Sequence, residues 1–195
     1  MEDRIAISRL KQGDLTGLEA LVNRYQAQAV HAAYLIVFDR ALAEDVVHTA
    51  FVKGAERIHQ FDEERSFAPW FFRIVANDAL KIAKRQKRSI SLEEQLDEPA
   101  TQYAQWLVDP SARPEQLLEE KETRQMILGA IQSLPPEQRV IIVMRYFLNM
   151  SEAELSMRME RPLSTIKWWL RDARKRLYDL MRPQDGSGSI GGKHG

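Results

Sequence analysis

Apolar residues recur at helical spacing over most of the 195-residue chain. They fall every three or four positions, which places them on one face of each predicted helix. Asp39 precedes one such segment and is expected to cap it. The pattern predicts helices over residues 1–12, 15–36, 41–58, 67–88, 115–133, 137–148, 151–161 and 164–180. The chain is therefore expected to be all-α.

The stretch from Ser151 to Arg176 predicts a helix-turn-helix. Ser151 and Glu154 have the spacing of a capping box, and Pro162 ends the first helix. The second helix begins at Ser164 or Thr165. Residues expected inside are Ala153, Leu155, Met159, Ile166, Leu170, Ala173, Leu177 and Leu180. The opposite face of the second helix carries basic, hydroxyl and indole groups, which suit the major groove of DNA, although a solvated basic helix would show the same pattern.

Two other predicted helices carry unusual polar faces. The helix over 41–58 keeps Glu44, Asp45 and His48 outside, and its inner face is expected to use Leu42, Val46, Thr49, Phe51 or Val52, and Ala55. The helix over 67–88 ends in five cations within eight residues, which are Lys81, Lys84, Arg85, Lys87 and Arg88. This exceeds what a helix dipole requires, so contact with phosphates is the better explanation.

Aromatic residues cluster where the helix over 67–88 begins. Trp70 and Phe71 are interpreted as core, whereas Phe67, at the edge of a polar loop, is interpreted as a stacking partner for a base. Trp169 lies beside the core stripe of the last helix and is interpreted as structural. Trp168 lies outside that stripe and is interpreted as a contact for DNA or for a partner, with a structural role left open.

Charge is segregated along the chain. The formal net charge is zero, yet residues 89–122 hold nine acids and two bases, together with three prolines. This composition predicts an acidic interdomain linker. We therefore expect two small helical domains, over residues 1–88 and 114–182, joined by a linker over 89–113 and followed by a flexible tail over 183–195.

Several classes of protein are disfavoured by composition. The chain has no cysteine, which excludes thiolate zinc sites and fits a reducing cytoplasm. Its longest apolar run is far shorter than the about 20 residues of a membrane span, so a cytoplasmic location without membrane insertion is expected. The Glu56-to-His59 spacing occurs in di-iron bundles, but the second such motif is missing. No enzymatic activity, catalytic residue, metal or cofactor is expected.

Three segments together resemble bacterial sigma factors of the small extracytoplasmic-function (ECF) group. Residues 43–51, AEDVVHTAF, resemble the helix that docks on the β′ coiled coil of RNA polymerase. Residues 61–77, FDEERSFAPWFFRIVAN, resemble the loop and helix that open and read the −10 promoter element. Residues 133–139, SLPPEQR, with the helix-turn-helix, resemble the reader of the −35 element.

This resemblance implies a sigma factor that directs core RNA polymerase to promoters through its β′ and β subunits and helps to melt promoter DNA. Many such proteins are held inactive by an anti-sigma factor. The residues implied for core polymerase are Glu44, Asp45, His48 and Phe51. Those implied for the −10 element are Arg65, Phe67, Arg73, Asn77, Lys81, Lys84, Arg85 and Arg88. Those implied for the −35 element are Arg145, Ser164, Thr165, Lys167, Trp168, Arg171, Arg174 and Lys175.

The chain departs from the family pattern at several positions. The family usually has Gln-Glu at residues 48–49 and glycine at Glu160 and Ser164, and Asp172 also replaces a more usual small or basic residue. Promoter preference therefore does not transfer. An alternative is a helix-turn-helix regulator whose residues 1–88 form a sensor domain. A sensor should enclose a pocket, whereas a sigma domain exposes Asp45 and Asn77.

Overall fold

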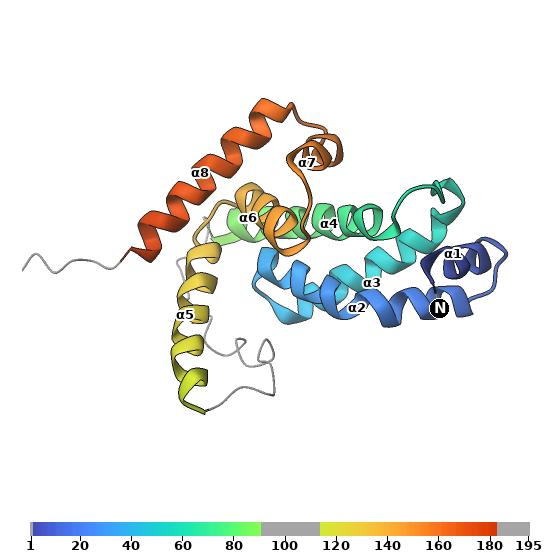
Figure 1. Ribbon diagram of the computed structural model, residues 1–195, viewed down its shortest axis with the longest axis horizontal. Coiled ribbons are helices and arrows are strands. Elements are labelled where there is room, and N and C mark those ends of the chain that lie inside the picture. Colours follow the sequence, from blue (N-terminus) through green and yellow to red (C-terminus); the bar gives the residue numbers. More distant parts are fainter. Residues whose placement is uncertain (1, 91–113, 183–195) are drawn as a thin grey trace, which may run out of the picture.

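A computed structural model of the chain describes residues 2–90 and 114–182, here called the N-terminal and C-terminal halves (Figure 1). The N-terminal half contains α1 (Asp3–Lys11), α2 (Thr16–Val37), α3 (Arg40–Glu56), the 3-10 turn η1 (Ile58–Gln60) and α4 (Phe67–Ile90). The C-terminal half contains α5 (Pro114–Gln132), α6 (Pro136–Ile142), the π-helical turn η4 (Val143–Phe147), α7 (Glu152–Met159) and α8 (Leu163–Met181). These described residues contain no strand, which confirms the predicted all-α fold. The predicted linker, apart from its first two residues, and the predicted tail lie outside the described residues.

Helices α2, α3 and α4 pack side by side around the core of the N-terminal half (Figure 1). Asp39 caps α3 as predicted, since its Oδ1 accepts a hydrogen bond of 2.9 Å from the Leu42 amide. The predicted inner face of α3 was wrong at Thr49, which is exposed. Of Phe51 and Val52, either of which was expected inside, Phe51 is the buried one. Helix α3 contacts both α2 and α4, so its buried stripe instead comprises Ala43, Val46, Val47, Ala50, Phe51 and Gly54.

The helix-turn-helix forms where it was predicted. The Ser151 Oγ accepts from the Glu154 amide at 3.2 Å, and Glu154 Oε2 accepts from the Ser151 amide at 2.7 Å, which completes the capping box. Helix α8 starts at Leu163, one residue earlier than expected, directly after the extended Pro162. Ala153 and Leu180 are exposed rather than buried.

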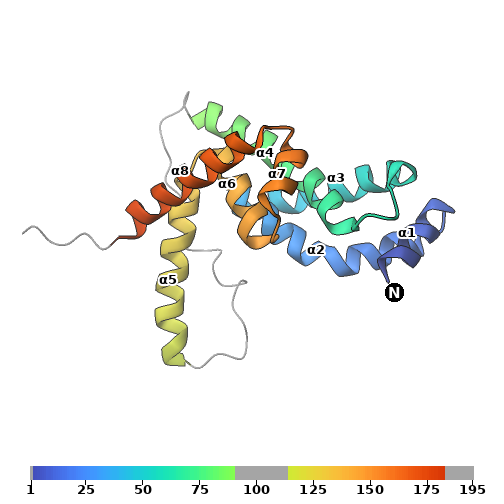
Figure 2. The same ribbon diagram turned by 45° about the horizontal axis from the view of Figure 1, so that its top comes forward.

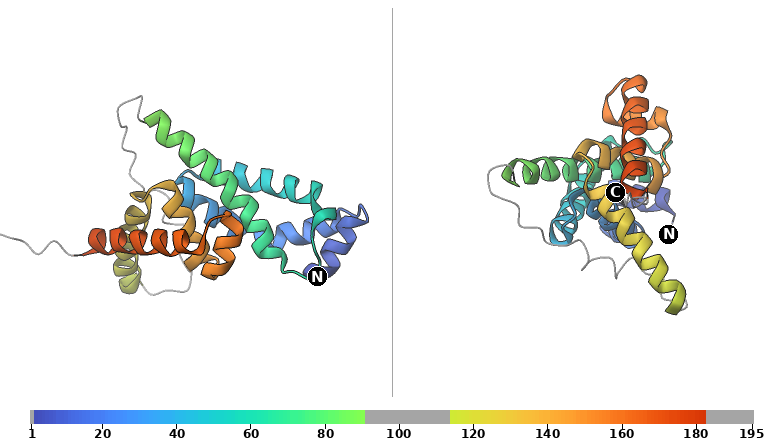
Figure 3. Two further views of the ribbon diagram at one scale, coloured as in Figure 1. Left: turned by 90° about the horizontal axis from the view of Figure 1, so that it is seen from above. Right: turned by 90° about the vertical axis from the view of Figure 1, so that its left-hand side faces the viewer.

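The two halves pack against each other along α2, α4 and α6, and Figures 2 and 3 show α6 next to α4 from other sides. The Arg139 guanidinium donates to the Ile36 carbonyl at 2.6 Å and lies over the Phe38 ring, 5.6 Å from its centroid. Ile36 is in the last turn of α2, where carbonyls lack helical partners, so a side chain of one half caps a helix of the other. His31 packs on Phe147, with ring centroids 4.6 Å apart.

None of the helices within residues 2–90 and 114–182 is long and apolar enough to cross a lipid bilayer.

Candidate nucleic-acid and polymerase interface

One side of α3 presents polar groups to solvent. Glu44, Asp45 and His48 are exposed as predicted. Val52 lies one turn beyond His48 on the same side and is also exposed, so it adds an apolar position to this surface. Phe51 was wrongly assigned to this surface, because it is only 7% exposed and its ring stacks on Phe71 at 4.4 Å.

A hollow of about 310 Å³ lies between the end of α3 and the middle of α4, here called the α3–α4 hollow. Its lining brings together three residues predicted for the −10 element, which are Arg73, Asn77 and Lys81. Six other lining residues were not predicted for this role, and they are Lys53, Arg57, Gln60, Trp70, Ile74 and Asp78. The signal that could have found Lys53 and Arg57 is their spacing of four, which places both cations on one side at the end of α3. Asp78 pairs with Lys53 at 2.7 Å and with Lys81 at 3.3 Å, so an acid shares the hollow with these cations.

The aromatic assignments at the start of α4 need one correction. Phe67, predicted to stack on a base, is 4% exposed and packs in a ring cluster with Tyr25 at 5.5 Å and Phe71 at 5.6 Å. It is buried because α2 crosses this point of α4. Phe71 is core as predicted, whereas Trp70 keeps part of its ring exposed to the α3–α4 hollow.

Two cations predicted for the −10 element are paired with acids of the C-terminal half. Arg73 forms an ion pair with Glu160 in the turn of the helix-turn-helix, and the Lys84 ammonium lies 2.9 Å from the Glu137 carboxylate. The other four cations predicted for the −10 element have exposed side chains, and they are Arg65, Lys81, Arg85 and Arg88. Lys81 pairs with Asp78 and Arg65 with Asp62, each three residues earlier in the chain.

The junction near Arg73 is electropositive. Burial, followed by the positive charges of Arg73 and Arg65, lowers the pKa of Arg158 on α7. Glu160 is the acid that pairs with Arg73 at this junction. An anionic group would be attracted to the same place for the same reason.

Helix α8 exposes most of the residues predicted for the −35 element, which are Ser164, Lys167, Trp168, Arg171, Arg174 and Lys175. Thr165 is half-buried. Trp169 packs against the core, as expected, while Trp168 is 53% exposed. Arg145 stands apart from this face, because its guanidinium donates to the Met150 carbonyl at 2.9 Å and so braces the segment before α7.

The Asp172 side chain points toward α6. Gln138 is buried on α6, and its Nε2 donates to Asp172 Oδ2 at 2.6 Å. This hydrogen bond, assisted by the ion pair with Arg176, lowers the pKa of Asp172. The acid at this unusual position therefore fastens α8 to α6, and it does not belong to the DNA-facing surface.

Comparison with known proteins matches both halves. A family model described as Sigma-70 region 2 matches residues 21–89, and one described as Sigma-70, region 4 matches residues 124–177. The chain belongs to the Sigma-70 family of sigma factors. It is 26% identical to the ECF RNA polymerase sigma factor SigW of Bacillus subtilis (strain 168), over 90% of this chain and 95% of SigW. It is also 26% identical to the ECF RNA polymerase sigma-E factor of Escherichia coli (strain K12), over 94% of this chain and 96% of that protein.

This sigma factor is thus of the extracytoplasmic-function group, as the sequence motifs indicated. It acts in promoter recognition by RNA polymerase, as a transcription initiation factor. The alternative of a regulator with an N-terminal sensor domain is not favoured, because the region 2 model covers most of that half.

Two solved structures share the fold of this sigma factor. CnrH, in complex with the cytosolic domain of CnrY, aligns with a TM-score of 0.62 at 22% identity over 92% of this chain and 96% of CnrH. The sigma factor RpoE of Bartonella quintana, in complex with the anti-sigma factor NepR, aligns with a TM-score of 0.62 at 16% identity over 85% of this chain and 97% of RpoE.

Proposed function

We propose that this sigma factor captures the unpaired −10 element at the α3–α4 hollow. The observation that carries the proposal is that Trp70, Asn77 and several cations line one hollow. The part-exposed Trp70 ring offers a stacking surface for an unpaired base. The exposed Asn77 amide can donate and accept hydrogen bonds at a base edge. The cations of the hollow suit the phosphates of a single strand, which would compete with Asp78 for Lys53 and Lys81.

The −35 element is assigned to α8. Its exposed cations and Trp168 lie along one surface of a helix held by the buried Leu170 and Ala173 on the opposite side. A helix that presents cations and a small hydroxyl, here Ser164, can enter a major groove and contact both phosphates and base edges. In this division, residues 1–88 form the −10 domain, 114–182 the −35 domain and 89–113 the linker between them.

Binding of core polymerase is assigned to the exposed face of α3, where Glu44, Asp45 and His48 would contact the β′ coiled coil. The β subunit would make a second contact with this sigma factor. DNA phosphates would then replace Glu160 and Glu137 as the partners of Arg73 and Lys84. The shared fold with a sigma factor bound to an anti-sigma factor supports the further proposal that such a regulator binds this chain.

Permanganate footprinting of unpaired thymines tests the assignment of the −10 site. Holoenzyme is assembled from core polymerase and the full chain on genomic promoter fragments that support run-off transcription. Asn77→Ala should lower thymine reactivity at −10 while protection of the −35 region is unchanged. The matched control is Asn23→Ala, an exposed asparagine on α2 outside the hollow, which should behave as wild type. Normal melting by the Asn77→Ala protein would show that the hollow does not read DNA.

A further inference from the structure

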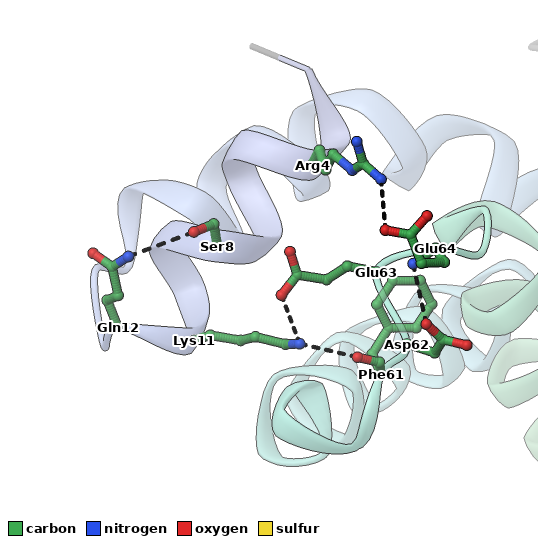
Figure 4. Close-up of polar contacts among 8 residues, drawn as sticks. All are labelled: Arg4, Ser8, Lys11, Gln12, Phe61, Asp62, Glu63 and Glu64. Atoms are coloured by element: carbon green, nitrogen blue, oxygen red, sulfur yellow. Dashed lines mark hydrogen bonds and ion pairs between the residues drawn. The ribbon is translucent and has the colours of Figure 1, made fainter.

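Helix α1 is tied to the loop over residues 61–66, which leads directly into α4 (Figure 4). The Lys11 ammonium donates to the Phe61 carbonyl at 3.0 Å and lies 2.8 Å from Glu63 Oε1. The Lys11 side chain is 23% exposed. Because the region 2 match begins at residue 21, α1 lies outside the family model, and no role is assigned to Lys11 by it.

Helix α1 is itself fixed firmly to α2. A Cβ atom on Gly17 would lie 2.2 Å from the Ala6 carbonyl oxygen, so the backbones of the two helices meet at a distance that only glycine permits. Asp3 pairs with Arg24 at 2.6 Å and also accepts from the Tyr25 hydroxyl. Burial, followed by the bond to Asp3, raises the pKa of Tyr25 to about 12, so this hydroxyl keeps its proton at neutral pH. The Lys11 side chain therefore extends from a helix whose position relative to α2 is fixed.

The loop over 61–66 is fixed by buried residues at both ends, and its middle, residues 62–65 and here called the crest, is largely exposed. Phe61 and Phe67 are buried at the two ends, with ring centroids 5.8 Å apart. The crest bonds to itself through Asp62, which accepts from the Glu64 amide at 3.1 Å and pairs with Arg65 at 3.2 Å. Such local bonds shape a turn, but they do not fix the turn relative to the rest of the fold.

Two cations of α1 reach the crest from outside, and they differ in strength. Arg4 pairs with Glu64, but the two side chains are 65% and 83% exposed, so solvent screens this pair. Lys11 is more sheltered and contacts both a backbone carbonyl and a carboxylate. Both contacts are charge-assisted hydrogen bonds, and the one that solvent screens less is the stronger.

We propose that Lys11 is a positioning residue that holds the loop over 61–66 in the shape required for capture of the unpaired −10 strand, a role that rests on the −10 assignment above. The loop precedes the turn of α4 that carries Trp70, and its Arg65 is one of the predicted −10 contacts. With the Lys11 bonds removed, the crest samples more conformations, and capture requires that they be restricted again.

The test compares Lys11→Met, which keeps an unbranched side chain and removes the charge, with Lys11→Arg, which restores two donors. Arg4→Met is the matched control at the exposed pair. Lys11→Met should lower permanganate reactivity at −10 about tenfold at saturating holoenzyme, the size expected when a charge-assisted hydrogen bond is lost. Lys11→Arg should recover most of the reactivity, and Arg4→Met should lose less than about twofold. The affinity for core polymerase should not change, and the thermal midpoint should fall by no more than a few degrees.

Amide hydrogen exchange of the free full-length chain provides a readout that does not depend on transcription. Lys11→Met should speed exchange in residues 61–66 and leave α3 unaffected. Unchanged exchange there, faster exchange with normal melting, or no rescue by Lys11→Arg would each overturn the role of Lys11. Failure of the −10 assignment is recognised separately, because it appears as normal melting by the Asn77→Ala protein whatever Lys11→Met does.

Discussion

Glu160 carries a backbone strain that a pair of substitutions can measure. It ends α7 in the left-handed region, at φ 53° and ψ 46°, where a side chain with a Cβ costs about 1–2 kcal/mol. Glycine has no such cost, although its greater freedom in the unfolded chain offsets about 0.5–1 kcal/mol. Both Glu160→Gly and Glu160→Gln remove the ion pair with Arg73, so the difference between them isolates the backbone. We expect Glu160→Gly to be the more stable of the two by about 1 kcal/mol.

Urea unfolding at pH 7, followed by circular dichroism, measures this difference, with slopes that should agree if the unfolded states are alike. The difference in the free energy of unfolding between wild type and Glu160→Gln then measures the contribution of the ion pair. We expect about 0.2–1 kcal/mol, because the Glu160 side chain is 77% exposed. The reasoning is refuted if Glu160→Gly is no more stable than Glu160→Gln.

Asp45→Lys should weaken binding to core polymerase at least tenfold without changing the free energy of unfolding, since Asp45 is exposed; equal retention of β′ in a pull-down would show that the α3 face is misassigned. Burial, then the charge of Arg124, lowers the pKa of His31, so the unfolded chain takes up this proton at higher pH than the folded one. Stability should therefore be full above about pH 6.5 and fall as the pH drops below it. Chemical denaturation between pH 7 and 5.5 should show a flatter profile for His31→Leu, and parallel profiles would exclude His31 as the cause.

Features set by neighbouring residues in the sequence could be predicted. The capping box at Ser151 needs only Glu154, three residues later, and Asp39 needs only the amide of Leu42. The exposed cations of α8 follow from the helical period alone, because the buried Leu170 fixes which side of the helix faces solvent.

Features set by distant segments could not be predicted in this way. Phe67 sits beside a polar loop in the sequence, yet Tyr25, which is 42 positions earlier on α2, covers it. Leu180 continues the apolar stripe of α8 in the sequence, yet its side chain is 54% exposed. The pairing of Arg73 with Glu160 joins residues 87 positions apart, and no local pattern indicates which acid a cation will meet.

The contact of Arg139 with the end of α2 bears on cooperativity. The Arg139 guanidinium is partly buried, which lowers its pKa, and it donates to a carbonyl 103 positions earlier in the chain. Cleavage between the halves followed by separation would leave the Ile36 carbonyl and the guanidinium without each other, and water would have to hydrate both. The free energies of unfolding of two isolated halves should therefore sum to less than that of the intact chain. The free energy of unfolding of the whole protein includes this interaction between the halves. Any motion that separates the halves must overcome the same interaction.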